Sequence, residues 1–184
     1  GCRMVEKDIS AFNKSLPFEM TGAQKNAVTE IISDMQKEIP MNRLLQGDVG
    51  SGKTAVAAAA CYFASENNCQ SALMAPTEIL ATQHFETLSG FLSPLGINVA
   101  LLTGSMTAKQ KKEVKEKLSS GECDVIVGTH ALITATTEFK KLGLVITDEQ
   151  HRFGVNQRAT LAEKGENPHK LVMSATPIPR TMGL

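Results

Sequence analysis

The sequence contains no tryptophan, only one tyrosine and no excess of basic residues. A protein that holds single strands of nucleic acid mainly by stacking bases on aromatic rings would be expected to contain more aromatic residues. Lysine and arginine together number 19, as do aspartate and glutamate, so the formal net charge at pH 7 is zero. The bulk charge therefore gives no sign of a nucleic-acid partner, although a local basic patch would be enough to bind one.

The four cysteines form no metal-binding pattern. Cys2, Cys61, Cys69 and Cys123 include no C-x-x-C pair and are accompanied by no His-x-x-x-His spacing, which argues against a zinc site. A disulfide framework is equally unexpected, because a chain of 184 residues is long enough to bury a full hydrophobic core. We expect reduced thiols.

Long hydrophobic runs are also missing. The first ten residues are polar, and the longest run of small apolar residues, 55–64, is about half the length of a membrane-spanning helix. We therefore expect a cytoplasmic protein with no membrane partner.

Short apolar runs alternate with longer helical patterns along the chain. The apolar runs are rich in β-branched residues and hardly alternate with polar ones, which is typical of strands covered on both faces. The candidate strands are 43–45, 71–74, 98–102, 124–127, 144–147 and 171–173. Two candidate helices begin at Thr21 and Lys53, and three more span 78–91, 108–118 and 155–163. This order predicts an α/β domain of three layers, with helices on both faces of a central, mostly parallel sheet.

The first residues do not follow this alternation. We interpret residues 1–15 as a connector from a preceding domain and residues 16–184 as the α/β domain itself. Pro17 marks the boundary, because proline disfavours a helical conformation of the residue before it.

The phosphate-binding loop motif G-x-x-x-x-G-K-[ST] is complete in this sequence, between a candidate strand and a candidate helix. Its backbone N–H groups are expected to cradle the phosphates of ATP. Lys53 is expected to reach the β and γ phosphates, and the Thr54 hydroxyl group to bind Mg²⁺. The motif comprises Gly47, Asp48, Val49, Gly50, Ser51, Gly52, Lys53 and Thr54. Kinases, GTPases, transporters and motors share such a loop, so it does not define the reaction.

An acidic pair, Asp148 and Glu149, follows the apolar run 144–147. In an open parallel sheet, ligands bind at the carboxyl ends of the strands, so the pair is expected near the phosphate loop. Asp148 is then placed to hold Mg²⁺ through water, and Glu149 to orient or deprotonate the attacking water. A kinase needs no glutamate beside its metal-binding aspartate, so the pair favours hydrolysis of ATP by water.

Six short motifs resemble those of superfamily 2 helicases and occur in the order typical of that superfamily. The segment 148–151 resembles the DEAD/DExH box, and the phosphate loop resembles motif I. The other four are the segments 75–78, 102–105, 127–130 and 174–176, the last of which resembles motif III. The resemblance implies a RecA-like domain that forms the first of two lobes of an ATP-driven motor.

Longer stretches resemble the RecG branch of these helicases, namely 16–24, 75–84, 148–158 and 174–181. The transcription-repair coupling factor Mfd shares the Arg152-Phe153-Gly154 stretch, but its box usually has a second Glu and a Gln, so His151 favours the RecG branch. That branch implies an ATP-dependent helicase that remodels branched or duplex DNA in repair and recombination. It also implies a second motor lobe and a DNA-binding wedge domain elsewhere in the same protein, which we expect to be a monomer.

The resemblance also implies roles for single residues. Gln24 would hydrogen-bond the adenine and Phe18 would pack near it, although both also suit the start of a helix. Short hydroxyl and backbone N–H donors would contact DNA phosphates without reading the base sequence, although the same residues can cap loops. These DNA-facing residues are Thr77, Thr103, Gly104, Thr129 and His130. Coupling between nucleotide and DNA is expected from Gln150, His151, Arg152, Ser174, Ala175 and Thr176.

Other interpretations stay open at this point. The chain can be the first lobe of another superfamily 2 translocase, such as Mfd. It can also be a nucleotide-gated clamp without motor activity, although a clamp needs no water-orienting carboxylate such as Glu149. A kinase or transporter ATPase is the weakest alternative, because the segments 75–78 and 174–176 have no place there.

Overall fold

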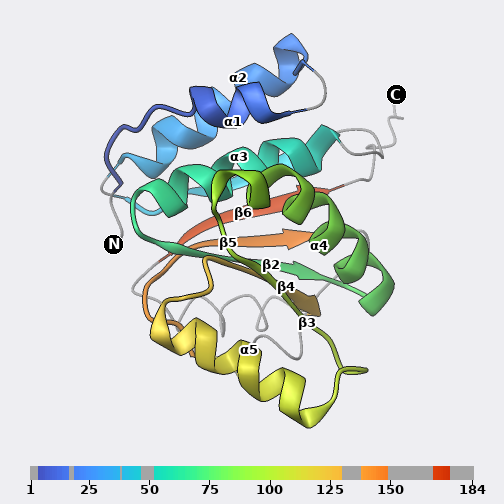
Figure 1. The fold of residues 1–184 in the computed structure, drawn as a ribbon. Helices are drawn as coiled ribbons and strands as arrows, with labels where there is room; N and C mark the ends of the chain where they lie inside the picture. Colours follow the sequence, from blue (N-terminus) through green and yellow to red (C-terminus); the bar gives the residue numbers. More distant parts are fainter. Residues whose placement is uncertain are drawn as a thin grey trace.

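The computed structural model describes residues 4–16, 19–37, 39–46, 52–129, 138–148 and 168–174. Within these ranges the chain forms a six-stranded sheet with helices on both faces (Figure 1). The strands are β1 (Asn42–Gln46), β2 (Gln70–Ala75), β3 (Val99–Leu102), β4 (Val125–Thr129), β5 (Leu142–Asp148) and β6 (His169–Ser174). The helices are α1 (Ser10–Ser15), α2 (Gly22–Met35), α3 (Gly52–Glu66), α4 (Glu78–Leu92), the 3-10 helix η1 (Ser93–Leu95) and α5 (Ala108–Ser120).

The strand order is β1-β6-β5-β2-β4-β3, and every neighbouring pair is parallel. This confirms the predicted α/β class and each of the six predicted strands, whose ends differ from the prediction by up to two residues. Every residue of β2 and of β5 is buried, which explains why these runs do not alternate between apolar and polar residues. The arrowheads of the strands point the same way in Figure 1, so their carboxyl ends share one edge of the sheet.

Two hydrophobic clusters lie on the two faces of the sheet. Leu73 and Ala75 of β2 belong to the larger cluster, with the residues of α3 and α4. The intervening Ala72 and Met74 belong to the smaller cluster, with Leu118 of α5. Helices α3 and α4 therefore cover one face and α5 covers the other, while α1 and α2 form a further layer outside α3 (Figure 1). Among the predicted helices, 155–163 lies outside the described residues.

The alanine-rich stretch forms the middle of α3. Residues 55–64 are all buried, because the sheet lies on one side of α3 while α2 and α4 pack on others. Alanine side chains are small enough to let these neighbours approach closely on every side. In the described part of the chain, no helix is both long and apolar enough to cross a membrane.

The described cysteines are buried. Cys61, Cys69 and Cys123 form no disulfide bond with one another. Burial raises the pKa of the Cys61 thiol to about 12, and burial with the nearby Asp124 carboxylate raises the pKa of Cys123 to about 12. Such thiols stay protonated at neutral pH and are poor metal ligands. The residues that the structure describes include no group of three or more His, Cys, Asp or Glu side chains arranged to hold a metal ion.

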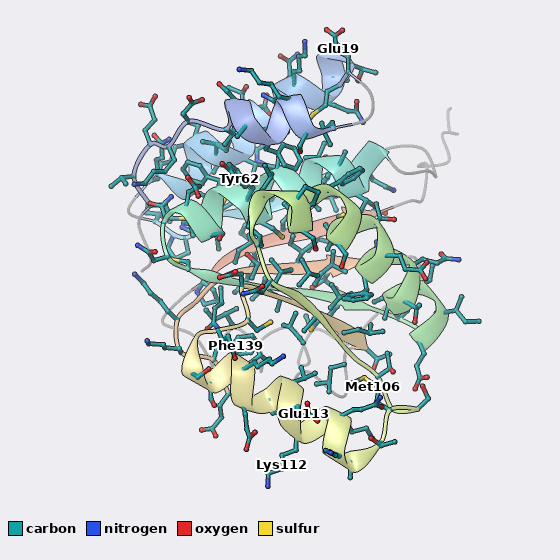
Figure 2. All side chains as sticks on the ribbon, in the orientation of Figure 1. Glu19, Tyr62, Met106, Lys112, Glu113 and Phe139 are labelled. Carbon is teal, nitrogen blue, oxygen red and sulfur yellow. The ribbon has the colours of Figure 1, made fainter. Side chains whose placement is uncertain are left out.

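The N-terminal segment contains a helix that the sequence did not predict. Helix α1 is only six residues long, and Phe12 is its buried residue. The Phe12 ring lies 5.9 Å from the ring of Tyr62 on α3, centroid to centroid, and Figure 2 shows Tyr62 between α3 and α1. Met4 is also buried, and its backbone N–H group donates to the carbonyl group of Met35 at 3.0 Å. Residues 4–16 thus pack on the α/β domain, and their origin as a connector stays a prediction.

Replacing Phe12 with alanine is expected to lower the free energy of unfolding by about 3–5 kcal/mol, because it leaves a cavity in the core. Urea unfolding of the chain measures this value. Val5→Ala is the matched control, since the Val5 side chain is 59% exposed and its truncation should change stability by no more than about 0.5 kcal/mol. Equal effects of the two substitutions would show that α1 is not part of the folded core.

Candidate functional site

The described residues with predicted functions gather at the carboxyl edge of the sheet. Apart from Gln24, in the first turn of α2, each lies at the end of a strand, in the loop after it, or in the first turn of the next helix. Lys53 and Thr54 open α3, Thr77 follows β2, Thr103 and Gly104 follow β3, and Thr129, Asp148 and Ser174 end β4, β5 and β6. The prediction that the acidic residue and the phosphate loop share this edge rests on the same parallel topology.

Lys53 contacts the end of β6 directly. Its Nζ atom donates a hydrogen bond to the main-chain oxygen of Ser174 at 2.9 Å. The contact is favoured by the sheet order, because β1 and β6 are neighbours and Gln46 lies opposite Ser174. Phosphate binding is the predicted role of Lys53 and coupling that of Ser174, so these two roles fall on residues that touch each other.

Thr54 and Asp148 provide oxygen donors suited to Mg²⁺. Both residues are buried, with 6% and 4% of their surface exposed. Mg²⁺ in nucleotide sites usually takes one or two carboxylates, a hydroxyl group, phosphate oxygens and water. A hydroxyl oxygen and a carboxylate oxygen at the phosphate-loop edge fit this donor set.

Asp148 also has a partner that the sequence analysis missed. Its Oδ2 atom lies 2.6 Å from Nε2 of His84, a residue in the middle of α4. A signal was present in the helical spacing, because His84 falls on the same helical face as Ala81 and Leu88, which are both buried. A histidine on the buried face of a helix next to the sheet indicates a polar partner in the interior of the domain.

The DNA-facing candidates have local roles in the structure. Thr77 is the N-cap of α4, and its hydroxyl oxygen accepts a hydrogen bond from the Leu80 N–H group at 3.2 Å. Thr103 is buried, with 3% exposed, and its hydroxyl group lies 3.4 Å from that of Ser105. Gly104 is exposed and Thr129 half-buried. The capping alternative is therefore observed for Thr77, and DNA contact stays a prediction for these four residues.

Two helices begin at this edge in addition to α3. Helix α4 begins after Thr77, and α5 begins after Thr107, whose side chain forms a capping box with Gln110. The first turns of these helices carry backbone N–H groups without partners in the helix, which favour anions. The loops after β2 and β3 are also close, since a Cβ atom on Gly104 would lie 2.8 Å from the Glu78 carboxylate.

Gln24 forms part of the start of α2. Its side-chain oxygen accepts from the Thr21 N–H group at 2.8 Å, and its own N–H group donates to the Thr21 hydroxyl oxygen at 3.1 Å. This capping box is the helix-start role that the sequence left open for Gln24. Its contact with adenine stays a prediction.

The other predicted site residues lie outside the described residues. Among the phosphate loop only Gly52, Lys53 and Thr54 are described, all in the first turn of α3. The predicted residues outside are Phe18, Gly47, Asp48, Val49, Gly50, Ser51, His130, Glu149, Gln150, His151, Arg152, Ala175 and Thr176.

A parallel sheet that presents a phosphate-loop lysine and a strand-end aspartate at one edge is typical of P-loop nucleotide-binding domains. Comparison with protein families agrees, because the family described as DEAD/DEAH box helicase matches residues 21–183. The match covers most of the chain, so the chain belongs to the DEAD/DEAH box helicase family.

Its relatives include the ATP-dependent DNA helicase RecG of Bacillus subtilis (strain 168), which is 55% identical over 182 residues, covering 99% of this chain and 27% of that protein. RecG of Aquifex aeolicus (strain VF5) is 55% identical over 181 residues, covering 97% of this chain and 23% of that protein. The chain thus spans about a quarter of the length of these relatives.

Solved structures show the same fold. The structure of RecG bound to a three-way DNA junction matches with a TM-score of 0.85 and 51% identity, covering 99% of this chain and 25% of that chain. The UvsW helicase from bacteriophage T4 matches with a TM-score of 0.67 and 17% identity, covering 95% of this chain and 62% of that chain. The second likeness extends to the fold alone. The match to RecG and the family match confirm the RecA-like architecture predicted from the sequence.

Proposed function

We propose that this chain is the ATP-binding lobe of an ATP-dependent DNA helicase or translocase of the RecG type, which remodels branched DNA such as forks and junctions in repair and recombination. The observation that carries the proposal is the 51% identity to RecG over 99% of this chain, in a structure where that protein is bound to a three-way DNA junction. The remaining partners follow from the same likeness. They are a second motor lobe and a wedge domain in one cytoplasmic, monomeric protein.

ATP binds at the carboxyl edge of the sheet, with its phosphates in the loop 47–54. The Lys53 ammonium group binds the β and γ phosphates, and Thr54 and Asp148 hold Mg²⁺, which neutralises charge on the phosphates when it is bound. Glu149 orients the attacking water or takes its proton. Gln24 and Phe18 hold the adenine.

DNA binds along the ends of β2, β3 and β4. The Thr77 hydroxyl oxygen already accepts a bond from Leu80, but its hydrogen can still be donated to a phosphate oxygen. Backbone N–H groups at the starts of α4 and α5 add sequence-independent contacts. Thr103, Gly104 and Thr129 lie on or beside the same loops, and His130 follows Thr129 in the sequence.

Coupling between the two ligands passes through the end of β6. The Lys53 ammonium group has three N–H donors, so it can bind phosphate oxygens while it also bonds the Ser174 carbonyl group, and it links the nucleotide to the end of β6. Nucleotide binding is therefore sensed at Ser174, which the coupling residues Ala175 and Thr176 follow in the sequence. The segment 150–152, after the acidic pair, responds to the same phosphates.

The proposal predicts a defined response of ATP turnover to DNA. In a chain that carries these residues and the second lobe, a three-way junction is expected to stimulate turnover. Glu149→Gln is expected to reduce turnover by about 10²–10⁴-fold, since it removes the general base while ATP binding is kept. Steady-state phosphate release and binding of a fluorescent nucleotide measure the two properties.

Glu86→Gln is the matched control, because it makes the same change on an exposed position of α4. It should leave turnover unchanged. ATP binding without any turnover by the unmodified protein would favour a nucleotide-gated clamp over a motor. Full turnover by Glu149→Gln would remove Glu149 from the mechanism.

A further inference from the structure

His84 and Asp148 are 64 residues apart in the sequence and meet at the carboxyl edge of the sheet. The Nε2–Oδ2 distance is 2.6 Å, and the two side chains are only 13% and 6% exposed. An ionised carboxylate can only accept hydrogen bonds, so Nε2 of His84 carries the proton and donates it. The bond is charge-assisted and shielded from water, which makes it a strong one.

The path of the chain explains why these residues meet. Met74 of β2 lies opposite Thr147 of β5, so Asp148 lies beside the point where the chain leaves β2 for α4. Helix α4 then runs back over the sheet, in contact with β2, β3 and β4. Its buried face carries His84, between Ala81 and Leu88, toward the end of β5.

A carboxylate as buried as Asp148 needs a hydrogen-bond partner of its own. His84 holds one oxygen, Oδ2, and Mg²⁺ or a water bound to it would take the other oxygen. Residues that hold a metal ligand by a hydrogen bond fix its orientation, and their loss typically weakens metal binding by about 10–100-fold. Leucine at position 84 would fill the space but leave the carboxylate without this donor.

We propose that His84 is a positioning residue that holds the Asp148 carboxylate in the orientation needed for Mg²⁺ binding. The inference rests on the proposed function, because it takes Asp148 as the residue that holds Mg²⁺. It gives α4 a second role, since the helix that starts at the DNA-facing Thr77 also fixes the carboxylate of the ATP site.

The test measures the Mg²⁺ dependence of nucleotide binding in a chain that carries both motor lobes. Binding of a fluorescent, non-hydrolysable ATP analogue is followed while Mg²⁺ is titrated. His84→Leu is expected to raise the half-saturating Mg²⁺ concentration by about 10–100-fold, while binding without Mg²⁺ is unchanged. His84→Gln keeps an N–H donor, in its side-chain amide, at a similar distance from the backbone. The Mg²⁺ dependence of this variant should therefore be close to that of the unmodified protein.

Two controls separate positioning from a merely structural contact. Glu86→Ala removes an exposed side chain from the same helix and should leave the Mg²⁺ titration unchanged. Thermal melting of each variant reports whether it is folded. A lower melting temperature of His84→Leu with an unchanged Mg²⁺ titration would overturn the proposal, as would equal shifts in His84→Leu and His84→Gln.

Asp148→Asn separates this inference from the proposed function beneath it. If Asp148→Asn leaves the Mg²⁺ dependence unchanged, the metal-binding role of Asp148 fails, and the positioning role fails with it. If Asp148→Asn shifts the dependence and His84→Leu does not, only the positioning role of His84 fails.

Discussion

Residues 1–184 alone are expected to hydrolyse ATP about 10³–10⁵-fold more slowly than the same residues in a chain that also carries the second motor lobe. The proposed function includes a split ATP site, in which the opposite lobe would supply an arginine to the phosphates. An arginine supplied across a cleft stabilises the charge of the transition state and can account for a rate factor of this size. Steady-state ATP turnover of both chains, with and without a three-way junction, measures the difference.

Nucleotide binding by residues 1–184 is the control for this comparison, because it shows that the slow chain is folded and its phosphate loop competent. DNA-stimulated turnover by residues 1–184 at about one per second or faster, a rate within the normal range of enzymes, would contradict the split site. A longer chain that binds ATP but shows no turnover would instead support the clamp interpretation.

Strands β2, β4 and β5 could be predicted because burial on both faces leaves a clear mark on the sequence. In β5, the residues Leu144, Val145 and Ile146 are all buried, although they alternate between the two hydrophobic clusters. A strand in that position tolerates few polar residues, so the apolar run stands out. The acidic residue that ends it could be placed at the functional edge because parallel strands share their carboxyl ends.

Helix α1 could not be predicted, because its stability depends on tertiary contacts and not on its own pattern. Helix α1 has one buried residue, Phe12, whose partner Tyr62 is fifty residues away in the sequence. A helix of six residues is too short to be stable alone in water. The packing of Phe12 on Tyr62 and the contacts of α1 with η1 and α4 fix its position.

The candidate site was predicted in part. Motif spacing identified Lys53, Thr54 and Asp148, because each is close in the sequence to a strand end. The contacts between them and other segments were not predicted, since the His84–Asp148 and Lys53–Ser174 bonds join residues that are 64 and 121 positions apart. For Thr77 the sequence could not decide between two roles, because its position suits both a helix cap and a DNA contact. The structure shows the helix cap.

Lys53→Ala is expected to reduce ATP turnover of the two-lobe chain by about 10²–10³-fold, the usual cost of removing one donor that stabilises transition-state charge. The substitution removes the ammonium group that is expected on the β and γ phosphates. It also removes the bond to the Ser174 carbonyl group, so the end of β6 loses its direct link to the phosphate site. Nucleotide affinity should fall together with the rate, because the lysine binds phosphates in the ground state as well.

Lys112→Ala is the matched control, since this lysine is exposed on α5 and points away from the sheet in Figure 2. It should leave turnover and nucleotide affinity unchanged. Lys53→Arg keeps the positive charge but replaces a compact ammonium group with a planar fork, so it should restore nucleotide binding more than it restores turnover. Turnover of Lys53→Ala within a few-fold of the unmodified protein would contradict the phosphate role. In that case the main function of Lys53 would be its bond to Ser174, which joins the first turn of α3 to the end of β6.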